Sequence, residues 1–246
     1  MAPVAVVILT AVPAMSATVG TRGSSRLFSG SNYNLAARTS FAPLRADVLG
    51  AGRSIVETTT VTASFLATID VFYSGLLSLS FAFAFAFAMG EEAALYDWIN
   101  AGGTMIYQGE NAAWGPTTNT FLSTAGLTQS SNVSGRAALF ATSASPLLAN
   151  GVAGSSMPFS AAGGIVGAEV TLATGDAGKT VAFWETYGDG SIIGVMDVDA
   201  SRDAVPRQFI LNAIDYSVAD VPLPAAAPLL AALGGLGVMA RRRRRS

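Results

Sequence analysis

The chain has 246 residues, of which 51% are hydrophobic and only 12% charged, so it can bury a sizeable core and is not an intrinsically disordered chain. Five of its 14 basic residues are arginines next to the C-terminus, which leaves nine against 16 acidic residues, and so acidic a body excludes a nucleic-acid-binding surface. The absence of Cys and His excludes cysteine nucleophiles, histidine bases, Ser-His-Asp triads, disulfides and zinc sites built from these residues.

The N-terminus has the pattern of a secretory signal. Residues 4–12 are apolar and have the length of a signal-peptide core, and Ala17 is a small residue suited to the cleavage site. We predict a signal peptide over residues 1–17 that signal peptidase removes, followed by a polar linker over residues 18–25. The usual N-terminal Lys or Arg is missing, so either the true start lies upstream or the amine of Met1 serves alone. The other interpretation of this stretch is a buried strand.

Strand and helix patterns then alternate through a domain predicted over residues 26–218. Period-two and period-3.6 patterns, with Gly and Pro punctuation, predict each element. Strands are expected over 26–34, 54–61, 70–80 and 104–111, and helices over 35–52, 62–69 and 91–103. Repeated βα units of this kind indicate a parallel sheet covered by helices.

Residues 77–89 alternate strictly with period two. This alternation places Phe81, Phe83, Phe85 and Phe87 on one face of any strand. An uncovered strand of this composition would pair with other chains and aggregate, so we expect it to be covered. Core packing or an expanded loop is favoured over a Phe-lined ligand groove.

The second half adds strands within residues 163–175, a hairpin turning at 186–191, and a final helix over 208–218. Four stretches of this pattern, at residues 97–107, 185–190, 196–197 and 209–213, resemble the class I glutamine amidotransferase-like fold. The resemblance implies a flavodoxin-like α/β sandwich. The matching stretches indicate the fold but say little about activity.

The resemblance places a nucleophile on the turn after the strand that ends near Gly109. Glu110 and Asn111 occupy that turn, and with no Cys or His the amidotransferase chemistry is missing. These two residues either cap the following helix or retain a ligand-binding role. Ser29, Ser31 and Asn32 follow the first expected strand, and with Glu110 they would border a cleft suited to a polar ligand such as a saccharide.

A second candidate site is an acidic loop near the end of the domain. Oxygen-bearing residues alternate there at Asp197, Asp199, Ser201 and Asp203, which is similar to the first half of a Ca²⁺-binding loop. Arg202 stands where such a loop needs Gly, and Gln208 where it needs a bidentate Glu. Any Ca²⁺ site is therefore expected to be weak, and the other interpretation is an acidic loop that caps the final helix.

The last segment, residues 219–246, has three parts in a fixed order. A short Pro-containing motif comes first, and an apolar span over about residues 225–240 follows it. As a helix this span would be ~24 Å long. Basic residues, which resist translocation across a membrane, come last. The motif is Val221, Pro222, Leu223, Pro224 and Ala225, and the basic residues are Arg241, Arg242, Arg243, Arg244 and Arg245.

This order resembles the VPLPA-CTERM variant of the PEP-CTERM sorting signal of Gram-negative bacteria. The resemblance implies processing by an exosortase-type enzyme, transient anchoring in the inner membrane with the domain outside the cytoplasm, and delivery to the cell surface or beyond it. An ordinary C-terminal membrane anchor would have the same topology.

Together these patterns predict an exported, surface-sorted protein with a catalytically silent domain that serves binding or structure, with envelope polysaccharide as a candidate partner. The alternative is a hydrolase that uses Glu110 with Asp197 or Asp199 on an envelope glycan or peptide. Two carboxylates within ~10 Å that face one cleft would favour the hydrolase. Carboxylates engaged in capping would favour the silent domain.

Overall fold

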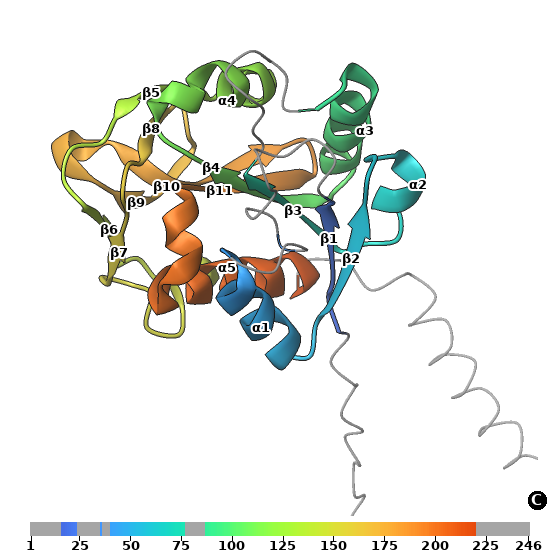
Figure 1. Cartoon of the computed structure of the whole chain (residues 1–246), viewed down its shortest axis with the longest axis horizontal. Coiled ribbons are helices and arrows are strands. Elements are labelled where there is room, and N and C mark those ends of the chain that lie inside the picture. The colour runs from blue at the N-terminus through green and yellow to red at the C-terminus, as the bar shows by residue number, and fades with distance from the viewer. Residues whose placement is uncertain (1–15, 24–34, 36–39, 77–86, 220–246) are drawn as a thin grey trace, which may run out of the picture.

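The computed structural model describes residues 16–23, 35, 40–76 and 87–219. Its centre is one mixed sheet of 11 strands (Figure 1). The strands are β1 (Thr18–Arg22), β2 (Ser54–Thr58), β3 (Val71–Leu76), β4 (Thr104–Gly109), β5 (Thr128–Asn132), β6 (Ala137–Phe140), β7 (Ser156–Pro158), β8 (Gly163–Val166), β9 (Val170–Thr174), β10 (Thr180–Tyr187) and β11 (Gly190–Met196).

Half of the sheet is parallel, in the order β2-β1-β3-β4-β11, which is the strand order of flavodoxin-like folds. Beyond β11 the sheet continues antiparallel through β10, β9, β6 and β7. The prediction of a parallel sheet is confirmed for the first half and wrong for the second. The reason is visible at the predicted hairpin: Gly188 (φ +62°) and Asp189 alone connect β10 to β11, and two residues permit only antiparallel pairing.

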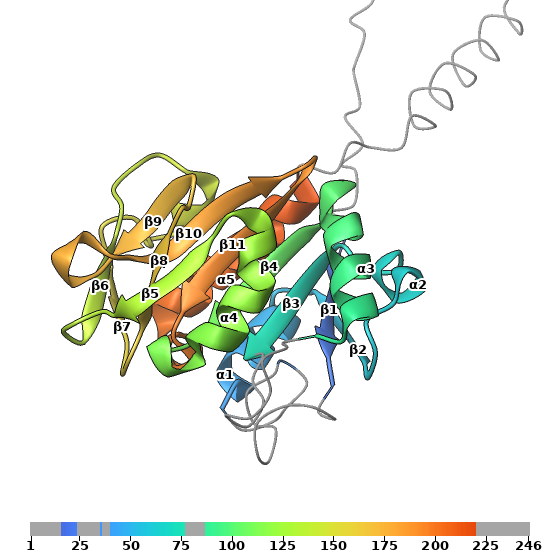
Figure 2. The same cartoon turned by 90° about the horizontal axis from the view of Figure 1, so that it is seen from above.

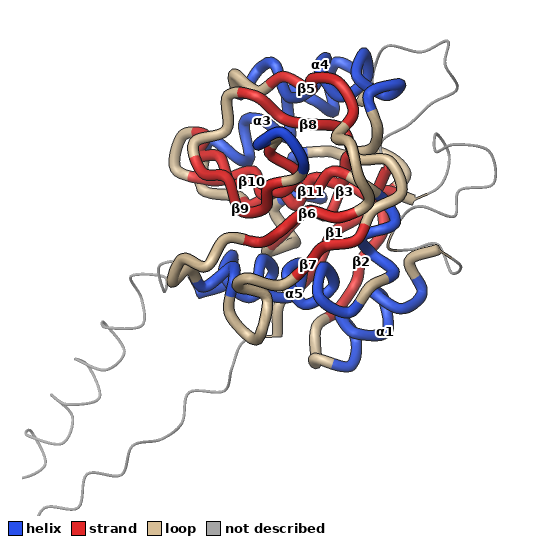
Figure 3. The backbone as a smooth tube through the Cα atoms, turned by 90° about the vertical axis from the view of Figure 1, so that its left-hand side faces the viewer, coloured by secondary structure: helices blue, strands red, loops and turns tan. Residues whose placement is uncertain are grey.

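Helices cover both faces of the sheet. In Figures 1 and 2, α3 and α4 lie on one face and α1 and α5 on the other, while α2 packs beside α3. The helices are α1 (Ala42–Gly50), α2 (Ala63–Leu66), α3 (Met89–Asn100), α4 (Gly115–Leu122) and α5 (Ala204–Ala219), with short 3₁₀ turns η1 (Ala112–Trp114), η2 (Ser123–Ala125), η3 (Pro146–Leu148), η4 (Asp176–Gly178) and η5 (Val198–Arg202). Figure 3 shows the antiparallel end of the sheet, where β5 and β8 pair near α4.

Aromatic side chains fill the layer between the sheet and the helices α3 and α4. The ring of Phe87 lies 5.4 Å from that of Phe121, which stacks at 5.9 Å on Tyr107, and all three side chains are buried. Contacts of this kind combine a large buried area with favourable ring geometry. Phe87 therefore packs in the core, which is one of the two interpretations left open for the Phe-Ala repeat, whereas Phe81, Phe83 and Phe85 lie outside the described residues.

The prediction of a linker over residues 18–25 is wrong for its first five residues, because β1 lies between β2 and β3 in the parallel half. Its polar composition is misleading. Arg22 is buried and forms an ion pair of 2.9 Å with the carboxylate of Glu91 in α3. Gly20 lies so close to Ile69 that a Cβ atom there would collide with that side chain. The domain therefore includes β1, and the strand expected over residues 26–34 lies outside the described residues.

Two further segments bear on the predicted boundaries. The helix expected over 35–52 is present as α1, which begins only at Ala42 and carries Pro43 in its first turn, where Pro is well tolerated. No helix in the described ranges is long and apolar enough to cross a membrane. The predicted sorting segment after residue 219, with its apolar span at 225–240, lies outside those ranges.

Candidate functional site

The carboxyl ends of the parallel strands meet at one edge of the sheet, where ligands bind in open α/β folds. β4 ends at Gly109 and is followed by Glu110, and its neighbour β11 ends at Met196 and is followed by Asp197. The fold thus brings together two carboxylates that are far apart in sequence. Ser29, Ser31 and Asn32, predicted to border the same cleft, lie outside the described residues.

Glu110 is buried, with 8% of its surface exposed. Its Oε2 accepts a hydrogen bond of 3.3 Å from the amide of Val198, and its Oε1 accepts one of 3.0 Å from the side-chain amide of Asn111. Burial, and next the negative charge of Asp197, raise the pKa of Glu110 to about 7. Both oxygens of this carboxyl group are therefore engaged within the protein.

Asp197 is 1% exposed and binds three backbone amides. Its Oδ2 accepts from Ser160 at 2.8 Å and from Ala161 at 2.9 Å, and its Oδ1 accepts from Asp199 at 2.6 Å. Burial raises the pKa of Asp197 above its ordinary value, against the opposing effect of these donors. Its φ of 156° with ψ of 127° is rare for a residue with a side chain. Asp197 thus fastens the loop before β8 to the end of β11.

Two buried glutamines hold the backbone around the carboxylates. Gln108 donates from Nε2 to the carbonyl oxygen of Asp197 at 2.6 Å, and its Oε1 accepts from the hydroxyl of Tyr73 at 2.7 Å. Gln129 donates from Nε2 to the carbonyl oxygen of Glu110 at 2.7 Å. The sequence analysis missed both residues. Gln108 could have been found as a long polar side chain in a mostly apolar strand, whereas no signal in the sequence marks Gln129.

The other predicted site residues have local roles. Asn111 caps η1 by accepting from the amide of Ala113 at 2.9 Å, which confirms the capping interpretation for this residue. Asp199 forms an ion pair of 2.6 Å with Arg202. Asp203 directly precedes α5, and its carbonyl oxygen accepts from the amide of Arg207 at 3.1 Å.

The weak candidate for a Ca²⁺ site is the acidic loop at Asp197, Asp199 and Asp203. Within the part of the chain that the structure describes, no three acidic side chains come together in a way that could hold a metal ion. Asp197 instead caps η5 through the amide of Asp199, so the acidic loop caps the short turn before α5 and not, as the alternative interpretation expected, the final helix itself.

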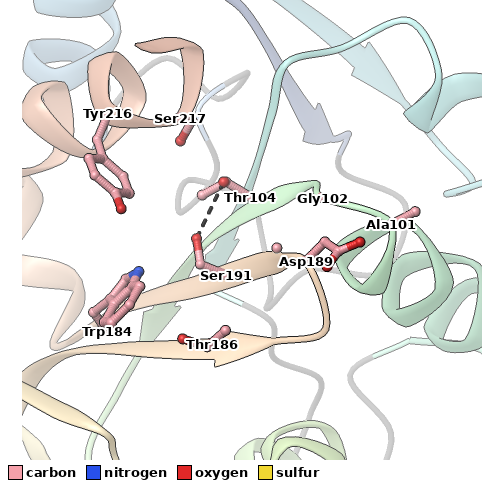
Figure 4. A pocket seen from close by; sticks show the side chains of 10 residues that line it. Ala101, Gly102, Thr104, Trp184, Thr186, Asp189, Ser191, Tyr216 and Ser217 are labelled. Atoms are coloured by element: carbon pink, nitrogen blue, oxygen red, sulfur yellow. Dashed lines mark hydrogen bonds between the residues drawn. The ribbon is translucent and has the colours of Figure 1, made fainter. Parts of the chain in front are cut away.

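A pocket of about 550 Å³ lies at the opposite, amino-terminal edge of the parallel strands (Figure 4). Ten residues line it, from the turn between α3 and β4, the start of β4, the hairpin of β10 and β11, and the last turn of α5: Ala101, Gly102, Thr104, Trp184, Thr186, Asp189, Gly190, Ser191, Tyr216 and Ser217. The sequence analysis did not identify this pocket as a site, because its residues come from four segments with no shared motif.

No family model and no curated protein matches this chain. Solved structures do match it. The cytoplasmic protein STM1381 from Salmonella typhimurium LT2 is 12% identical with a TM-score of 0.59, over 81% of this chain and 98% of that one. The mmIFT52 N-terminal domain is 10% identical with a TM-score of 0.60, over 83% and 100%. A putative ThuA-like protein from Bacteroides uniformis ATCC 8492 is 12% identical with a TM-score of 0.54, over 82% and 91%.

At these identities the likeness concerns the fold alone. The chain has a mixed, sheet-dominated α/β fold, and its neighbours include a second putative ThuA-like protein, from Parabacteroides merdae, with a TM-score of 0.54. This agrees with the glutamine amidotransferase-like class of fold that the sequence indicated. A fold of this kind hosts many functions, so activity has to be argued from the site.

Proposed function

We propose that this chain is an exported, surface-sorted protein whose amidotransferase-like domain is catalytically silent and serves binding or structure at the cell envelope or its extracellular matrix. One observation carries the silent-domain part. At the turn after β4, where the resemblance expects a nucleophile, Glu110 is buried and both of its carboxyl oxygens are hydrogen-bonded to Val198 and Asn111. The chain has no Cys or His that could act in its place.

The chemistry of the remaining groups supports the same conclusion. An amidotransferase forms a thioester, which requires a thiolate and a base beside it. A carboxylate is a poor nucleophile towards an amide. The single lysine, Lys179, is half-buried and donates from Nζ to Ser131 Oγ and to the carbonyl oxygen of Asn132, each at 2.7 Å, so its ammonium is held as a structural cation.

The first expected result is that the purified protein releases no ammonia from glutamine. The Glu110→Gln variant is expected to behave identically, because the side chain that it replaces has no catalytic role in this proposal. A coupled ammonia assay over several hours measures both proteins. Ammonia release by the parent protein that disappears in Glu110→Gln would overturn the silent-domain proposal.

A carboxylate-dependent hydrolase is the second candidate, and the raised pKa of Glu110 beside Asp197 favours it, since general acids are tuned in this way. The bonding pattern argues against it. Asp197 has three amide donors and almost no exposed surface, so it has no oxygen to offer a substrate or a water molecule. Hydrolysis of an envelope glycan or peptide that Glu110→Gln abolishes would favour this candidate instead.

The proposal that the protein is exported rests on the two ends of the sequence. The fold is compatible with removal of the signal peptide at the proposed site. Cleavage after Ala17 would leave β1 complete from Thr18. The backbone nitrogen of Thr18 lies 2.7 Å from the carboxylate of Asp70, so the new α-ammonium group would form an ion pair there. This pair offsets the loss of Ala17, which is buried and whose carbonyl oxygen accepts from Ser54.

The second expected result concerns processing. Mature protein from a host with the exosortase-type enzyme is expected to lack residues 1 to about 17 and the tail beyond about Val221. Replacing Arg241 to Arg245 by Ser should raise premature release, because positive charge resists translocation. Mass spectrometry of intact surface and secreted protein measures both results. Surface material with an intact arginine-rich C-terminus would refute the sorting proposal.

A further inference from the structure

The pocket at the amino-terminal edge is built on a polar row across three strands. Thr186 of β10 pairs in register with Ser191 of β11, which pairs with Thr104 of β4, so the three side chains face the same side of the sheet. The hydroxyl oxygens of Thr104 and Ser191 lie 3.4 Å apart. Two residues further along, the corresponding pair is Ile193 and Ile106. The hydroxyl groups thus replace core side chains where the sheet meets the pocket.

Two aromatic side chains form one side of the pocket. Figure 4 shows Trp184 and Tyr216 on one side of Ser191 and Thr104, with the indole nitrogen of Trp184 turned towards them and Asp189 on the other side. The indole N–H of Trp184 is buried and has no hydrogen-bond acceptor among the described residues. A buried donor without an acceptor is unfavourable, and an acceptor on a ligand would satisfy it.

The charge of the residues that line the pocket disfavours anionic ligands. Asp189 is the single charged residue among those that line the pocket, and it is exposed. With no Lys or Arg in the lining, a phosphate, sulfate or carboxylate group would meet repulsion from Asp189 and no cation to pair with. A ligand with hydroxyl groups can instead donate to the Asp189 carboxylate and accept from the Trp184 indole.

We propose that this pocket binds a ring of a neutral saccharide. The sugar's C–H face packs on the aromatic side chains, and its hydroxyl groups bond to Asp189, Trp184 and the row of hydroxyls at Thr104 and Ser191. A volume of about 550 Å³ is within the usual size range of small-ligand sites. The binding role in the proposed function would thus have a specific site. The biological setting of this site rests on the proposed function. The site does not involve Glu110.

The experiment titrates the purified full chain with neutral cello-, malto-, manno-, galacto- and chito-oligosaccharides of two to four rings, up to ~10 mM, with oligogalacturonate as the anionic comparison. Tryptophan fluorescence and calorimetry report binding. At least one neutral oligosaccharide is expected to bind. Trp184→Phe, which keeps a ring and removes the N–H donor, should weaken it about fivefold, and the exposed substitution Asp189→Asn should weaken it by a similar factor.

Trp114→Phe is the matched control, because Trp114 belongs to η1 at the opposite edge of the sheet and should leave the affinity unchanged. The proposal is overturned if no neutral oligosaccharide binds, if oligogalacturonate binds equally well, or if both pocket variants bind like the parent protein. The binding assay uses purified protein, so a negative result would refute the saccharide site without bearing on export. Export is tested separately, by mass spectrometry of the processed protein.

Discussion

Replacing Asp197 by Ala is expected to lower the free energy of unfolding by about 3–5 kcal/mol, because the substitution leaves three amides without their acceptor in a nearly sealed environment. Asp197→Asn should cost less, about 1–2 kcal/mol, since its amide oxygen can still accept from Ser160 and Ala161, although its NH2 group then faces the amide of Asp199 and the negative charge is lost. Urea denaturation at pH 7 measures both changes. The loop at Ser160 should also become more sensitive to proteases, because Asp197 fastens it to β11.

Asp215→Ala provides the matched control. Asp215 forms an ion pair with Arg53, but its side chain is mostly exposed, so its removal should cost no more than about 1 kcal/mol. If Asp197→Ala is no more destabilising than Asp215→Ala, Asp197 does not hold the loop in solution. It would then be free for a ligand or a substrate, which would favour the hydrolase.

Much of the parallel half of the fold could be predicted because its patterns are local. Short stretches rich in apolar residues predicted β3 and β4, and acidic residues followed by glycines predicted α3. β1 was missed because its stability depends on distant partners. Arg22 is tolerated in a buried strand because Glu91, almost 70 residues later, neutralises it. The polar strand β5 was missed for the same reason, since it pairs with β8 far along the chain.

The candidate site could be predicted by position but not by role. The resemblance placed Glu110 after β4, and the pattern of alternating acids marked Asp197. What these groups do depends on amides supplied by Ser160, Ala161 and Val198, which carry no sequence signature because any residue offers an N–H. The pocket around Trp184 could not be predicted for a related reason. Its residues come together only through the pairing register of β10, β11 and β4, which the sequence does not show.

Glu110→Gln is expected to remove a large part of the pH dependence of stability. The pKa of Glu110 is about 7 in the folded protein against an ordinary 4.5, so between these values the folded state binds more protons than the unfolded state. The stability that protonation of Glu110 provides is fully present below pH ~4.5 and is lost as the pH rises through about 7. This difference corresponds to about 3 kcal/mol.

In Glu110→Gln the group cannot ionise, so its curve of unfolding free energy against pH should be flatter between pH 5 and 8. The variant places an amide donor opposite the side-chain amide of Asn111, which should cost about 1 kcal/mol at pH 5. At pH 8, where the parent protein carries a buried charge beside Asp197, the variant should be more stable by about 1–2 kcal/mol. Urea denaturation at half-unit pH intervals would reveal this change of sign.

Glu57→Gln, at an exposed position on β2, is the control and should follow the parent curve at every pH. Parallel curves for the parent and Glu110→Gln would mean that solvent reaches the carboxylate or that a cation neutralises it. Either result would return Glu110 to the set of ligand-binding candidates. A change of sign would establish Glu110 as a buried acid that lowers the stability of the domain at neutral pH.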